Sequence, residues 1–148
     1  MRSVLRTRLT SVAEAIGVVE KRESRYAGLA RRAALGLAAA RVGLGAAAIV
    51  MPGRALRPWI GEDSGRLGSA VIGRALGGRD IALGLGSLMA ARKGTPIRGW
   101  TEAAALSDLI DTAATAVSFG KLPSGGRWLV LASSAGAAAV GVTSARFL

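Results

Sequence analysis

The stretch AAALSDLIDTAATAVSF, residues 103–119, places Asp108 and Asp111 three residues apart inside an otherwise apolar segment. Two similar segments carry the other interior charges, which are Arg41 in one and Arg74, Arg79 and Asp80 in the other. An unpaired charge is too costly in hydrocarbon to face lipid. We therefore expect these six side chains to turn toward one another inside a helical membrane protein, with the alternative that Arg74, near the start of its segment, reaches the interface instead.

Composition agrees with that expectation. Of 148 residues, 51% are hydrophobic, yet only 4% are aromatic and 21 are glycine. A water-soluble core built from Ala and Gly would bury little area per residue. Between transmembrane helices, small residues instead allow the backbones to approach closely.

Some kinds of chemistry are excluded by residue types that are missing. The chain contains no cysteine and no histidine. Disulfides, thiolate metal sites, histidine-ligated haem and histidine-dependent catalysis are therefore absent within it. We expect no metal, no cofactor and no enzymatic activity.

The formal net charge of +11 has two other readings. Arginine supplies 17 of the 20 basic residues, a bias that a genome rich in G and C also produces. A basic chain also suggests nucleic-acid binding. Because the charges here flank apolar segments, we expect the lipid bilayer, not nucleic acid, to be the partner.

Residues 1–28 form a polar N-terminal part with a helical pattern. Apolar residues recur at spacings of four and three, typical of one helix face: Leu5, Leu9, Val12, Ile16 and Val19. A basic amphipathic helix of this kind can lie on an anionic membrane surface. Packing against the remaining helices or a second copy of the chain is the equal alternative.

Residues 29–148 are predicted to contain four membrane spans, at about 33–50, 67–91, 101–119 and 128–145. Each has about the 20 residues that a bilayer crossing needs, and the last contains no charged residue. Arg31-Arg32 before the first span resembles an export signal, but Arg41 inside the apolar run counts against that reading. The fold prediction is thus an all-α, four-helix membrane bundle.

Small residues mark the packing face of the second predicted span. Gly73, Gly77 and Gly84 fall on one helical face with Asp80. Gly73 and Gly77 form a GxxxG step, which favours tight contact between helices. We expect these glycines to be helix-packing positions.

Basic residues outside the spans predict the orientation of the chain. Twelve lie in the N-terminal tail, the loop between the second and third spans, and the C-terminus, whereas five lie in the other two loops. Such residues accumulate on the cytoplasmic side. The prediction is a multi-pass protein of the cytoplasmic membrane with both termini in the cytoplasm.

The interior charges have a structural and a functional interpretation. We expect Arg41 and Arg79 to be the partners of Asp108 and Asp111, since an arginine fork binds a carboxylate through two bonds. Such a network fixes helix register. Intramembrane carboxylates also occur in ion and proton paths, which Thr115 would extend.

One stretch carries a resemblance. The sequence from Arg74 to Gly86 contains a Gly-Arg-Asp step, and Ser107-Asp-Leu-Ile-Asp111 follows after Trp100. Across about residues 33–145 the chain resembles a group of small four-span bacterial membrane proteins of uncharacterised function. The resemblance implies helical membrane architecture and no particular activity.

Two functions follow as hypotheses. The first is a non-enzymatic structural or interaction protein that packs with itself or with a membrane partner. The second is a small transporter or channel-like protein that uses Asp80, Asp108 and Asp111 to move protons or a cationic solute. A cavity that leads to Asp108 would favour the second.

Overall fold

The computed structural model describes the backbone of residues 2–148 and the side chains of residues 17–148. Within that range the chain is helical, without strands, which confirms the all-α class. Its elements are α1 (Arg2–Val50), α2 (Pro52–Ile60), η1 (Gly61–Gly65), α3 (Leu67–Arg92), α4 (Arg98–Val117), η2 (Phe119–Lys121) and α5 (Ser124–Ala145).

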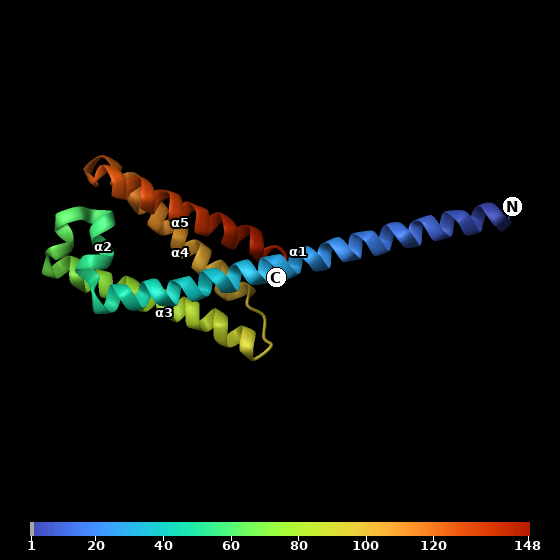
Figure 1. Ribbon diagram of the computed structural model, residues 1–148, viewed down its shortest axis with the longest axis horizontal. Coiled ribbons are helices and arrows are strands. Elements are labelled where there is room, and N and C mark those ends of the chain that lie inside the picture. The colour runs from blue at the N-terminus through green and yellow to red at the C-terminus, as the bar shows by residue number, and fades with distance from the viewer. Residues whose placement is uncertain (1) are drawn as a thin grey trace.

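The four long helices pack as two antiparallel pairs, α1 with α3 and α4 with α5 (Figure 1). The short helix α2 and the 3₁₀ segment η1 connect the first pair at one end, where α2 also contacts α5. Residues 93–97 join the two pairs at the other end. Turn residues explain the breaks: Pro52 begins α2, and Gly61 and Gly94 adopt φ values of 64° and 68°, which favour glycine.

Helix α1 is a single element of 49 residues. At 1.5 Å per residue it is about 74 Å long, far more than a bilayer core, and its N-terminal part projects away from the other helices (Figure 1). The structure thus differs from the expected separation at residue 28, because the helix has no break there. Of the predicted apolar face, Leu5, Leu9, Val12 and Ile16 lie outside the described side chains, and Val19 is exposed.

Among the residues whose side chains the structure describes, two helices, not four, are long and apolar enough to cross a membrane: α1 over Gly17–Val50, and α5. Length and composition therefore support two of the four predicted spans. Helices α3 and α4 have sufficient length, with 26 and 20 residues. They fall short in apolar character because they carry Arg74, Arg79 and Asp80, or Glu102, Asp108 and Asp111.

The interior consists mainly of small residues. Seven of its nine buried hydrophobic residues are alanines; the other two are Leu56 and Ile97. Gly45 and Gly77 face each other across α1 and α3, where a Cβ on either would lie 2.5–2.6 Å from the other's carbonyl oxygen. A Cβ on Gly84 would lie 2.5 Å from the Ala38 carbonyl oxygen. Close backbone approach therefore holds the α1–α3 pair together.

We predict that Gly77→Ala destabilises the protein by about 1–3 kcal/mol, because the added methyl group forces α1 and α3 apart. The adjacent Gly78 is the matched control, since nothing lies within 4 Å of the Cβ position there. Gly78→Ala should be neutral or stabilise the helix by about 0.5–1 kcal/mol. Thermal unfolding in detergent, followed by circular dichroism, measures both; equal effects would contradict the proposed contact.

Candidate functional site

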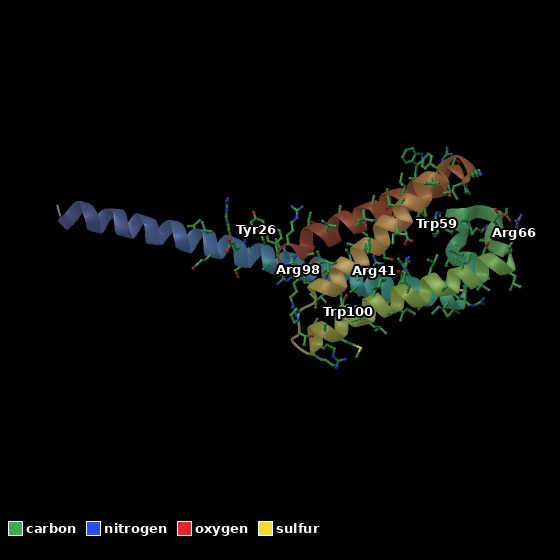
Figure 2. The ribbon with its side chains drawn as sticks, turned by 180° about the vertical axis from the view of Figure 1, so that it is seen from behind. Tyr26, Arg41, Trp59, Arg66, Arg98 and Trp100 are labelled. Atoms are coloured by element: carbon green, nitrogen blue, oxygen red, sulfur yellow. The ribbon has the colours of Figure 1, made fainter. Side chains whose placement is uncertain are left out.

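The candidate site begins at a charged residue in a row of small ones on α1. Ala34, Ala38 and Gly45 lie on the same buried face as Arg41, at spacings of three and four residues. Because its neighbours on that face are small, the long Arg41 side chain has room to extend between α3 and α4. Figure 2 places Arg41 between the end that carries Trp59 and the end that carries Trp100.

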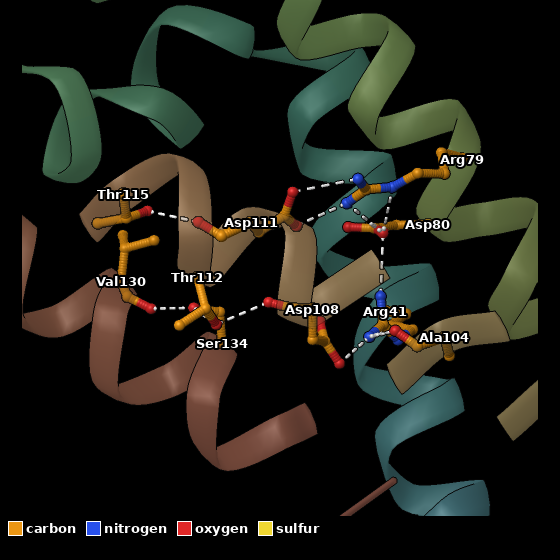
Figure 3. A network of polar contacts seen from close by, with 10 residues as sticks. All are labelled: Arg41, Arg79, Asp80, Ala104, Asp108, Asp111, Thr112, Thr115, Val130 and Ser134. Carbon is orange, nitrogen blue, oxygen red and sulfur yellow. Dashed lines mark hydrogen bonds and ion pairs between the residues drawn. The ribbon is translucent and has the colours of Figure 1, made fainter. Parts of the chain in front are cut away.

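Arg41 connects three helices. Its Nη1 donates to Asp80 Oδ1 at 3.1 Å, and its Nη2 donates to the Ala104 carbonyl oxygen at 3.1 Å and to Asp108 Oδ2 (Figure 3). Arg41 and Asp108 are each only 8% exposed. A buried pair of this type depends on both members, because removal of one leaves an uncompensated charge.

Arg79 continues the chain of charges. Its guanidinium forms two hydrogen bonds with Asp111, from Nη2 to Oδ2 at 2.8 Å and from Nη1 to Oδ1 at 3.2 Å. It also donates to Asp80 Oδ1, at 3.2–3.3 Å. The pairs expected from the sequence, Arg41 with Asp108 and Arg79 with Asp111, are both present, and Asp80 joins them.

The network contains an odd number of charges. Its members alternate in sign in the order Asp108, Arg41, Asp80, Arg79, Asp111. The expected sixth member, Arg74, is exposed, and no ion pair to it occurs among the described residues. Near the start of α3, its long side chain reaches the surface instead. With all five groups ionised, the network has one negative charge in excess.

The three carboxylates are not equally compensated. Asp80 Oδ1 accepts hydrogen bonds from two guanidinium groups, and Asp111 accepts one at each oxygen. Asp108 is held by one nitrogen of Arg41, and among the described residues nothing donates to its Oδ1. The most buried carboxylate therefore has the fewest charged donors.

A cavity of about 360 Å³ lies beside the network, between the two helix pairs and toward α2. Asp80, Asp108 and Asp111 all line it with Arg41 and Arg79. The other walls are largely apolar: they include Leu37, Leu44, Leu56, Trp59, Leu76 and Val130. The side chains of Asp80 and Asp111 remain 22% exposed, so the cavity reaches the outside of the molecule.

The opposite side of the network is closely packed. A pocket of only about 20 Å³ lies there, between Ala34, Ser87, Thr101 and Gly141, with Arg41 and Asp108 as its boundary toward the larger cavity. Such a volume holds about one water molecule. The larger cavity thus extends from the acidic groups toward α2, whereas the side toward residues 93–97 is closely packed.

Thr115 does not extend the charged line as expected. It is buried, but its Oγ1 donates to the backbone oxygen of Asp111 at 2.8 Å. The sequence analysis missed Thr112, whose Oγ1 makes hydrogen bonds with the Asp108 carbonyl at 2.7 Å and with Ser134 Oγ at 2.8 Å (Figure 3). The sequence feature that pointed to Thr112 was its position one helical turn after Asp108. This contact attaches the segment that carries Asp108 to α5.

The predicted small-residue face of α3 is found. Gly73, Gly77 and Gly84 are buried against α1 and α2. Asp80, on the same helix, is partly buried and points into the network.

Residues 17–148 contain no group of three or more acidic side chains arranged to hold a metal ion. Two guanidinium groups separate the aspartates instead. Comparisons with protein-family models, with curated proteins and with solved structures find no match. Function is therefore argued from the site itself.

We predict that Arg41→Gln destabilises the protein by about 3–5 kcal/mol, because Asp80 and Asp108 lose a shared buried partner. Arg74→Gln, on an exposed position of α3, is the matched control and should change stability by less than about 0.5 kcal/mol. Unfolding midpoints in detergent compare the two. A similar small loss in both variants would show that the network contributes little.

Proposed function

We propose that this is an integral membrane protein in which α1, α3, α4 and α5 all cross the bilayer. The support is that large apolar side chains lie outside and small ones inside, the reverse of a water-soluble protein. Large apolar residues are exposed: Leu44 is 68% exposed, Ile72 60%, Leu106 59% and Val117 90%. The interior contains alanine, glycine and paired charges, so hydrocarbon is a better solvent than water for this surface.

The proposed orientation puts both termini in the cytoplasm. Its support is the excess of basic residues at the end formed by the N-terminal part, residues 93–97 and the C-terminus. In this orientation the cavity lies on the side of the network that faces away from the cytoplasmic end.

The first test is extraction from membranes. We expect the protein to stay in the membrane fraction after washes with high salt and alkaline carbonate, and to dissolve in detergent. A basic protein bound to nucleic acid or to lipid headgroups by charge alone would be released by salt. Release by either wash would overturn membrane insertion.

Within the membrane, we propose that the cavity binds a cationic solute, as in a small transporter or channel-like protein. One observation carries this proposal: three aspartates share two arginines and line an open, largely apolar cavity. A single positive charge in the cavity neutralises the excess negative charge, and the apolar walls favour an organic cation. A cavity of this size is typical of small-molecule sites.

Tetraphenylphosphonium is a suitable probe, and tetraphenylborate is its anionic counterpart of the same shape. We expect the purified protein to bind the cation and not the anion in calorimetric titrations. Asp108→Asn should weaken binding by about tenfold or more, or about 1.4 kcal/mol. Asp63→Asn, on the exposed segment η1, is the control and should bind normally. Equal binding of the cation and the anion would mean that the apolar walls alone, and not the aspartates, determine binding.

A non-enzymatic structural or interaction role is the second candidate. The observation that favours it is that the network joins α1, α3 and α4 through five side chains. Outward-facing glycines at positions 36, 43 and 136 also leave room for a helix from a second copy or a membrane partner. Loss of stability in Arg41→Gln without any cation binding by the parent protein would favour this role.

A further inference from the structure

We infer that Asp108 carries a proton in the empty protein and releases it when a cation enters the cavity. This inference rests on the proposed cation-binding function. It adds a mechanism, in which one proton leaves for each positive charge bound. Two properties of the network support it: its charge balance, and the unequal hydrogen bonding of its three carboxylates.

The first step is the charge count. Three aspartates and two arginines leave one negative charge without a partner, and no other ionisable side chain of residues 17–148 lines the cavity. An uncompensated charge is costly in apolar surroundings. No group of acidic residues among the described side chains is arranged to hold a metal ion. In the absence of a solute, a proton on one carboxylate balances the network.

The second step identifies the carboxylate. Asp80 and Asp111 each accept at least two hydrogen bonds from guanidinium groups, which favour their ionised forms. Asp108 accepts from one nitrogen of Arg41, and its Oδ1 has no donor in the described part of the chain. Oδ1 can therefore bear a hydrogen while Oδ2 keeps its bond to Arg41.

The charged groups around Asp108 all belong to the network. Helix α1 contributes Arg41, α3 contributes Arg79 and Asp80, and α4 itself contributes Asp111. Helix α5 presents uncharged groups, Ser134 and Ala137 among them, and α2 lines the cavity with Ala55, Leu56 and Trp59. The balance is therefore decided within the five-residue network.

The exchange itself conserves charge. The O–H bond of the Asp108 carboxyl breaks, its electron pair stays on the carboxylate, and the proton passes to water in the cavity. The incoming cation then lies beside the carboxylate. The network and its contents are neutral before and after the exchange, so neither state leaves a charge exposed to lipid.

Infrared spectroscopy of the full chain in nanodiscs at neutral pH tests where the proton resides. We expect a carbonyl band of a protonated carboxyl group that Asp108→Glu shifts and Asp111→Glu leaves in place. Both variants keep a carboxyl group at the substituted position. Asp111→Asn should abolish the band, because two aspartates then balance two arginines. The inference would be overturned by absence of the band, or by its insensitivity to Asp108→Glu.

Proton release tests the exchange. Titration of the protein with tetraphenylphosphonium in buffers of different ionisation enthalpy should give about one proton released per cation bound. Binding without release would overturn the exchange and leave the cation-binding function intact. No binding, with the Asp108 band present, would overturn the function and keep the proton on Asp108.

Discussion

The requirement that buried charges be balanced within the molecule determines how these helices are placed. Arg41 is central because it reaches α3 and α4 from α1, with Asp80 and Asp108 on its two terminal nitrogens. Each of these helices also carries apolar surface, which could pack equally well in other arrangements. The ion pairs are directional, so they select one register and one rotation for each helix.

Small residues make this network possible. A guanidinium group can link two neighbouring helices only if their backbones lie close together. Gly45 and Gly77 provide that proximity between α1 and α3, and Ala105 meets Gly141 between α4 and α5. The interior therefore gains little from large apolar side chains. Its cohesion comes from close packing and from charge pairing, which suits an environment without a strong hydrophobic driving force between helices.

Much of the site could be predicted from the sequence because a charge in an apolar helix has few acceptable positions. Helical periodicity placed Asp108 and Asp111 on one face, and the cost of burial required arginine partners for them. For Arg74 the sequence left two positions open, the interior and the interface. Its place near the start of α3 lets a long side chain leave the interior, and sequence spacing alone does not reveal the distance to the surface. The Thr112–Ser134 contact depends on tertiary packing, and so does the cavity between the two helix pairs.

The loss of Arg74 from the interior also changes the functional argument. A set of six charges would be neutral, so it could hold the helices together without a bound ligand. A set of five cannot be neutral when every member is ionised. The excess lies beside a cavity that extends toward α2, and the other side of the network is closely packed. A purely structural network would gain stability from a sixth charge or from filling of the cavity. The combination of an odd charge with an open space is therefore the feature that favours a cationic ligand over a structural role alone.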